Sequence, residues 1–252
     1  MKIAVLGWGS LIWDNRELAI VGDWQAGGPV LPIEFSRISG DGRLTLVIDP
    51  QNGANVITLF AGSGFENLDD AIANLRDREG TSSDRIGYVN LTSNTERDYS
   101  RRQHPEACNV IKSWAQTNDW QAVIWTALPS NFTEKFLRSY TVGAAVAYVH
   151  KLPEDKRAKA FEYIQKAPEQ IDTPFRREFQ EIRKRHSRQF RKATAKEILG
   201  HAMTEESLPD APKLIVPNSW HGKRKMRRDA YQIPGQTAAD LRLGLSDQGN
   251  VI

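Results

Sequence analysis

The chain of 252 residues has little cysteine and no long apolar segment. Its single cysteine, Cys108, excludes an internal disulfide framework and is typical of a reducing compartment. No apolar run approaches the ~20 residues that a helix needs to span a bilayer. Met1 and Lys2 lead directly into an apolar segment, without the parts of a secretory signal peptide. We therefore expect a cytoplasmic, globular protein without a membrane partner.

Signals for metal and nucleic-acid binding are also sparse. The formal net charge of +3 is too small to indicate nucleic-acid binding by itself. The histidines lack the spacing of metal ligands, so we expect no metal site from His104, His150, His186, His201 and His221.

The positive charge is concentrated in Arg176–Lys192, where eight Lys or Arg and two Glu give a local charge of +6. Apolar residues recur there at helical spacing, which predicts a long helix with one apolar face and basic other faces: Phe175, Phe179, Ile182, His186 and Phe190. This helix and Lys223–Arg228 could bind nucleic acid or another polyanion. We favour solvated basic faces, because the phenylalanines share the apolar stripe and are not free to stack on bases.

Periodicity and turn residues predict an α+β fold. Apolar and β-branched runs predict strands over 3–6, 30–37, 44–49, 55–61, 86–91 and 122–127, with a hairpin turn at Ser39–Gly42. Helical spacing predicts helices over 68–79, 106–117, 133–140, 142–152 and 154–166. Prolines interrupt the pattern after Gly200. We therefore expect one domain over residues 1–204 and a C-terminal extension, 205–252, that packs on the domain or is partly mobile.

The segment Ile3–Trp13, IAVLGWGSLIW, carries the first chemical signal. A strand that ends in Gly-Trp-Gly-Ser exposes backbone N–H groups that can hold an anion. The G-x-G-x-x-G dinucleotide fingerprint fails, because position 12 is Ile. The G-x-S-x-G nucleophile elbow fails, because Leu11 and Ile12 follow Ser10. The alternative to an anion site is a glycine-tightened turn without a ligand.

Glu79 carries the second signal, at the end of a helix with clear boundaries. Asn67 is a typical N-cap, and Gly80 suits the left-handed residue that follows a helix. A carboxylate at a helix C-terminus is destabilised by roughly 0.3–1 kcal/mol. The same field should raise the pKa of Glu79, which helps a carboxylate act as a base. The alternative is a solvated Glu79 paired with Arg76 or Arg78.

Taken together, GWGSLIW, the strand NVITLFA, the helix NLDDAIANL and the segment RDREG resemble the gamma-glutamylcyclotransferase-like family, and the ChaC-type branch most of all. That family shows G-Y-G-S-L-I-W after its first strand, and Trp8 stands here in place of the Tyr. It later has a strand–helix unit that ends in an R-E-x-G or D-E-x-E-G-type segment, whose Glu is the catalytic base. By position and context this Glu falls on Glu79. The resemblance covers roughly residues 1–95.

The resemblance implies a gamma-glutamylcyclotransferase-like mixed β-barrel with surrounding helices, and a lyase of glutathione-related metabolism that needs no cofactor. The α-carboxylate of a small γ-glutamyl substrate would bind at the turn, and Arg37 could add a charged contact to a carboxylate. Glu79 would take a proton from the substrate's α-amine, which attacks its own γ-carbonyl and releases 5-oxoproline and a free amine. The substrate-binding residues are then Gly7, Trp8, Gly9, Ser10, Leu11 and Arg37.

Several alternatives stay open beside this hypothesis. Arg37 can be an exposed strand-end arginine. The chain can be a non-catalytic binding or regulatory module that keeps the carboxylate site and recruits a partner through its basic segments. It can also be a related acyl transferase or amide hydrolase. For Cys108 we expect a partly buried, inert thiol, with a Cys108–His104 pair as the alternative.

Overall fold

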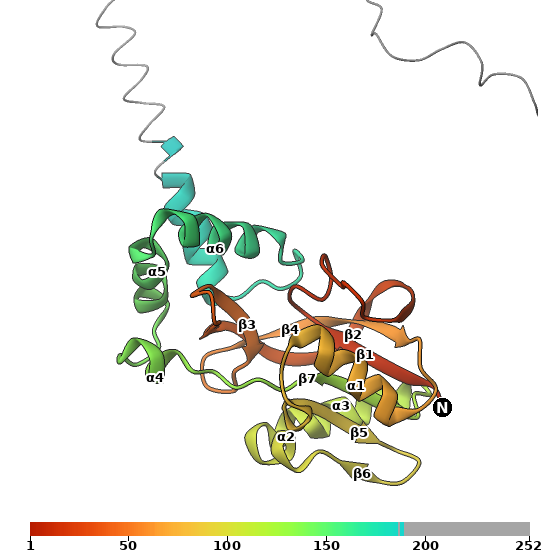
Figure 1. The fold of residues 1–252 in the computed structure, drawn as a ribbon. Helices are drawn as coiled ribbons and strands as arrows, with labels where there is room; N and C mark the ends of the chain where they lie inside the picture. Colours follow the sequence, from red (N-terminus) through yellow and green to blue (C-terminus); the bar gives the residue numbers. More distant parts are fainter. Residues whose placement is uncertain (186, 189–252) are drawn as a thin grey trace, which may run out of the picture. The chain divides into compact units, whose positions relative to one another are not determined.

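The computed structural model describes residues 1–185, 187 and 188, and it places one seven-stranded sheet among helices (Figure 1). The sheet order is β3-β2-β4-β1-β7-β5-β6, in which β1 and β7 pair in parallel and the other described pairs are antiparallel. The α+β class is therefore confirmed. No ladder within the described residues joins β3 to β6. The strands are β1 (Ile3–Gly7), β2 (Ile20–Ile38), β3 (Leu44–Ile48), β4 (Ala54–Ser63), β5 (Ile86–Asn90), β6 (Thr95–Glu96) and β7 (Ala122–Thr126).

Every helix predicted up to residue 166 is present, whereas η1 and α2 were not predicted. The helix predicted over 133–140 is wrong in length: α4 ends at Phe136, because Leu137 takes a left-handed conformation with a φ of 56°. None of the described helices is long and apolar enough to cross a membrane. The helices are α1 (Leu68–Glu79), η1 (Ser83–Arg85), α2 (Asp98–Gln103), α3 (Pro105–Thr117), α4 (Phe132–Phe136), α5 (Val142–Lys151) and α6 (Glu154–Lys166), and the chain is helical again over 174–185.

Strand β1 lies near the middle of the sheet and has core on both faces. Its side chains alternate, as the pleat of a strand requires. Ala4 and Leu6 join the larger core, which also contains residues of α3, α5 and α6. Ile3 and Val5 join a smaller core with Ile72 and Leu75 of α1. Helix α1 is therefore fixed across β1 and β7, and the ends of β1 and α1 can meet at the same side of the sheet (Figure 1).

Both ends of α1 are capped as the sequence predicts. The Asn67 side chain accepts hydrogen bonds from the N–H groups of Asp69 and Asp70. At the other end Gly80 takes a φ of 59°, and its N–H donates to carbonyls of the last turn. These caps place Glu79 as the last residue of the helix.

Strands β2 and β3 form the predicted hairpin, and the turn between them lies at Ser39–Gly42. Strand β2 is much longer than predicted, since it begins at Ile20. Two irregularities in its pairing with β4 break the alternation that would reveal the first half of the strand. Gly22 and Gly27, both with positive φ, lie in these irregular parts.

The helix over 174–185 has the predicted apolar face, since Phe175 and Phe179 are buried. The prediction of solvated basic faces is wrong for Arg176. This side chain is buried, and it donates to the carbonyls of Ala167, Pro168 and Ile171. Two ion pairs form within this helix, Lys184 with Glu181 and Arg185 with Glu178. His186, Phe190, residues 223–228 and the predicted extension 205–252 lie outside the described residues.

Candidate active site

The turn after β1 is closed by two backbone hydrogen bonds. The N–H groups of Ile12 and Asp14 donate to the carbonyls of Gly9 and Ser10, at 3.0 and 2.9 Å. In the described part of the chain, no hydrogen bond engages the N–H groups of Gly9 and Leu11. Gly9 and Leu11 both line a cavity, and the binding of an anion by their N–H groups stays a prediction.

The two glycines of the turn are required by close packing rather than by unusual dihedral angles. A Cβ atom at Gly7 would lie 2.7 Å from Ile12 Cδ1 and 2.8 Å from the Trp24 ring. A Cβ atom at Gly9 would lie 2.7 Å from the Tyr163 hydroxyl. The second contact brings α6 against a turn more than a hundred residues earlier in the chain.

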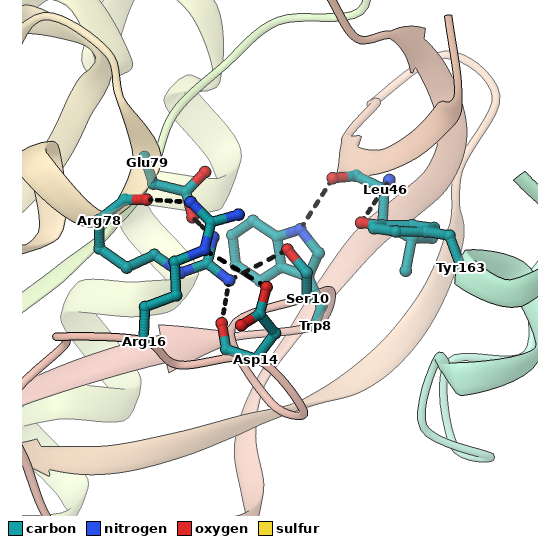
Figure 2. A network of polar contacts seen from close by, with 8 residues as sticks. All are labelled: Trp8, Ser10, Asp14, Arg16, Leu46, Arg78, Glu79 and Tyr163. Atoms are coloured by element: carbon teal, nitrogen blue, oxygen red, sulfur yellow. Dashed lines mark hydrogen bonds and ion pairs between the residues drawn. The ribbon is translucent and has the colours of Figure 1, made fainter. Parts of the chain in front are cut away.

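Trp8 is buried in the larger core, and its indole N–H donates to the Leu46 carbonyl at 3.3 Å (Figure 2). The aromatic residue at this position therefore ties the turn to β3. The only polar atom of the Trp8 side chain already has a partner. Trp8 therefore lines the cavity without a free side-chain donor for a ligand.

Arg78 links the turn to Glu79 (Figure 2). Its guanidinium donates to Glu79 Oε1 at 2.7 Å, to Ser10 Oγ at 3.2 Å and to the Asp14 carbonyl. The Arg78 side chain is 4% exposed and the Glu79 side chain is 15% exposed. The predicted pairing of Glu79 with an arginine of α1 is present, but the pair is buried instead of solvated.

Burial raises the pKa of Glu79 above its usual value, against the opposing charges of Arg78 and Arg16. The direction agrees with the prediction, and the dominant cause differs, since desolvation outweighs the other influences. A carboxylate whose charged form is disfavoured in this way has a higher affinity for a proton. It is therefore a better general base than an exposed glutamate.

The turn and Glu79 line one cavity with a volume of about 340 Å³. Six of the seven predicted site residues lie on its wall: Trp8, Gly9, Ser10, Leu11, Arg37 and Glu79. Gly7 lies behind the wall, packed against Ile12 and Trp24. The structure thus brings together residues that are about seventy positions apart in the sequence.

Arg37 reaches this cavity from the end of β2. The pairing of β2 with β3 shifts register between Phe35 and Arg37, which changes the direction of the strand at that point. Arg37 Nη1 donates to the Pro129 carbonyl at 2.8 Å. The alternative of an exposed strand-end arginine does not hold, because the Arg37 side chain is half-buried and faces the cavity.

The cavity is also lined by residues that were not among the predicted substrate contacts, and these include Arg16, Arg43 and Tyr163. The Tyr163 hydroxyl accepts a hydrogen bond from the Leu46 N–H at 3.5 Å and is also close to the Ser10 N–H. Burial raises the pKa of Tyr163 to about 12. The Arg43 guanidinium stacks 5.5 Å from the centre of the Tyr163 ring. No local pattern points to Tyr163, since its spacing on α6 is that of an ordinary core residue.

Cys108 is a buried residue of α3, in the larger core and away from the cavity. Burial raises the pKa of its thiol to about 11, so the thiol is protonated at neutral pH and is a poor nucleophile. This agrees with the inert thiol that we expected.

A scan against models of protein families and searches of curated proteins and of solved structures found no match to this chain. The family resemblance therefore rests on the sequence motifs alone.

Proposed function

We propose that the protein is a gamma-glutamylcyclotransferase-like enzyme, which cleaves a γ-glutamyl amide to 5-oxoproline and a free amine. In fold, the proposal assigns the seven-stranded sheet and its surrounding helices to that family. The observation that carries the proposal is the shared cavity, in which Glu79 lies beside the Gly9–Leu11 turn and is joined to it through Arg78.

The first supporting argument is the match between the site and the two charged groups of a γ-glutamyl head group. The free N–H groups of Gly9 and Leu11 suit a carboxylate. Glu79 suits the α-amine, which is attached to the same carbon atom as that carboxylate. A substrate bound through both groups has its γ-carbonyl positioned for attack by its own amine.

The reaction then needs only a bound conformation and proton transfer. Glu79 takes a proton from the attacking α-amine while the nitrogen forms a bond to the γ-carbonyl carbon. The bond from that carbon to the leaving nitrogen breaks, and the leaving amine receives the proton. Because the attack is intramolecular, correct orientation alone can supply effective molarities of about 10⁵ M or more.

The size and charge of the cavity also suit this substrate class. Small-molecule sites span roughly 300–1,000 Å³, and the volume of about 340 Å³ lies at the small end of this range. Four arginines and one glutamate line the wall, which favours a ligand that carries carboxylates: Arg16, Arg37, Arg43, Arg78 and Glu79.

The product identifies the reaction. Wild-type protein should release 5-oxoproline from a panel of γ-glutamyl amides and release nothing from the same compounds with an acetylated α-amine. Release of glutamate instead would indicate the amide hydrolase. Binding of the panel without any product would indicate the non-catalytic module.

A further inference from the structure

A second cavity lies between β2 and the start of α3. Its volume of about 570 Å³ is within the range of small-molecule sites, and it shares no lining residue with the cavity of Glu79. Most of its lining side chains are apolar, and they include Val30, Pro32, Pro50 and Val110. Val30 and Val110 are 47% and 40% exposed, so the second cavity presents apolar surface to water, and covering such surface is favourable.

His104 places a polar group in this apolar cavity. It connects α2 to α3, lines the second cavity and is 4% exposed. Its Nδ1 atom is enclosed without a hydrogen-bond partner. In the described part of the chain, no hydrogen bond uses its Nε2 atom, and this atom is not enclosed. Nε2 is therefore the polar atom of His104 that a bound molecule would meet.

The protonation of His104 follows from its surroundings. Burial lowers the pKa of His104 below its usual value, against the opposing charge of Asp49. The imidazole is thus neutral at neutral pH and carries one N–H. An enclosed N–H without a partner is rarer than an enclosed acceptor without one, which favours the tautomer with its proton on Nε2. His104 then presents a hydrogen-bond donor to the second cavity.

The start of α3 adds further donors beside His104. No side chain caps this end of the helix, and Pro105 has no N–H. Within the residues that the structure describes, no hydrogen bond engages the N–H groups of Glu106 and Ala107, and both residues line the second cavity. The helix dipole adds partial positive charge at this end. The polar part of the second cavity therefore suits an acceptor.

The charges near the second cavity oppose an anion as this acceptor. Among the described residues, Glu106 is the only charged one that lines it, and its carboxylate already complements the dipole of α3. Asp49 adds a negative charge that acts on the imidazole. The nearby Arg101, which donates to the Pro105 carbonyl, is paired with Glu96 at 2.6 Å. A cation would meet the donors and the positive end of the helix dipole, so a neutral acceptor fits best.

We propose that the second cavity binds a neutral, mostly apolar molecule that carries a carbonyl oxygen. The apolar walls hold the body of this ligand. Its oxygen accepts hydrogen bonds from His104 Nε2 and from the N–H groups at the start of α3. The proposal does not depend on the proposed function, because it uses no residue of the cavity that contains Glu79.

The test uses three probes of nearly the same size: acetophenone, ethylbenzene and benzoate. Ethylbenzene lacks the carbonyl oxygen of acetophenone, and benzoate carries a negative charge. Dissociation constants are measured by ligand-observed NMR for the wild type, His104→Phe, Val110→Trp and Val21→Trp. Val110→Trp narrows the second cavity. Val21→Trp is the matched control, since Val21 is 64% exposed and does not line the second cavity.

We expect the wild type to bind acetophenone more tightly than ethylbenzene. A cavity without donors has the opposite preference, since burying a carbonyl group without a hydrogen bond is unfavourable. His104→Phe should bind acetophenone about 5- to 10-fold more weakly, as for the loss of one hydrogen bond, and should bind ethylbenzene no more weakly. Val110→Trp should weaken the binding of both probes, and Val21→Trp should weaken neither. Benzoate should bind equally to the wild type and Val110→Trp.

Four results would overturn the proposal. The first is tighter binding of ethylbenzene than of acetophenone by the wild type, or no binding of acetophenone. The second is an equal loss of both probes in His104→Phe. The third is equal affinity for acetophenone in Val110→Trp and Val21→Trp, which decides the matter even where His104→Phe does not fold. The fourth is tighter binding of benzoate than of acetophenone that Val110→Trp removes.

Discussion

Replacing Arg78 with methionine removes the group that joins Glu79 to the turn and keeps most of the apolar stem. The wild-type guanidinium donates to Glu79, Ser10 and the Asp14 carbonyl, and the side chain is 4% exposed. Its loss leaves the Glu79 carboxyl buried without its cation. Because Arg78 is the largest influence that lowers the pKa of Glu79, this pKa should rise further in the variant.

Breaking a buried ion pair on one side typically costs 3–5 kcal/mol. We expect about 3 kcal/mol for Arg78→Met, near the lower limit of that range, because Glu79 keeps 15% exposure and can take up a proton. For a domain of this size the loss corresponds to a fall of roughly 6–12 °C in melting temperature. The double variant Arg78→Met/Glu79→Gln should recover part of the loss, since it contains no unpaired carboxylate.

The assay is denaturant unfolding followed by tryptophan fluorescence, with Arg76→Met as the matched control. Arg76 lies on the same helix, pairs with Asp77 at 2.7 Å and is 36% exposed. An exposed pair of this kind contributes about 0–1 kcal/mol. If Arg78→Met and Arg76→Met unfold at the same denaturant concentration, the assignment of a buried pair to Arg78 and Glu79 is wrong.

Other predictions concern pH, packing and thiol chemistry. The raised pKa of Glu79 means that kcat/KM should rise with pH through a value above that of an exposed glutamate, as the carboxyl loses its proton. The same raised pKa means that the contribution of Glu79 to stability is lost as pH rises through its folded-state pKa, so the wild type should lose stability over this range and Glu79→Gln should lose less; the same pH dependence in both proteins would contradict the dominance of burial. Gly9→Ala should cost about 1–3 kcal/mol, because the new Cβ would lie 2.7 Å from the Tyr163 hydroxyl, whereas Gly143→Ala, which meets nothing within 4 Å, should not destabilise the fold. The Cys108 thiol, with its pKa of about 11, should react with a disulfide reagent at pH 8 only after unfolding; rapid reaction of the native protein would contradict its burial.

The sequence was sufficient to predict a helix or strand whose ends and buried face are set by its own residues. Helix α1 is the clearest case, because Asn67 and Gly80 mark its ends and Ile72 and Leu75 mark its buried face. Glu79 follows Leu75 by four residues, so the same helical spacing that buries Leu75 turns Glu79 toward the sheet. This spacing could therefore have predicted that Glu79 is largely buried. From the sequence, we instead considered a pair of Glu79 with an arginine only as a solvated pair.

The sequence was not sufficient to predict features that are set by contacts between residues far apart in the chain. The first half of β2 is hidden by Gly22, Gly27 and its two irregularities, and its place in the sheet comes from pairing with β4. Tyr163 reaches the turn because α6 packs on the larger core, which no pattern within 154–166 reveals. The carbonyl acceptors that bury Arg176 are likewise set by the path of the chain over 167–171.

The most direct test of the account is the release of 5-oxoproline from γ-glutamyl amides by Glu79→Gln beside Asp77→Asn. Asp77 is two residues earlier on the same helix, 67% exposed and outside the cavity. Loss of a general base reduces the rate by about 10²–10⁴, so Glu79→Gln should lose that much of kcat while Asp77→Asn keeps the wild-type value. Wild-type kcat in a folded Glu79→Gln protein would contradict the assignment of the chemistry to Glu79.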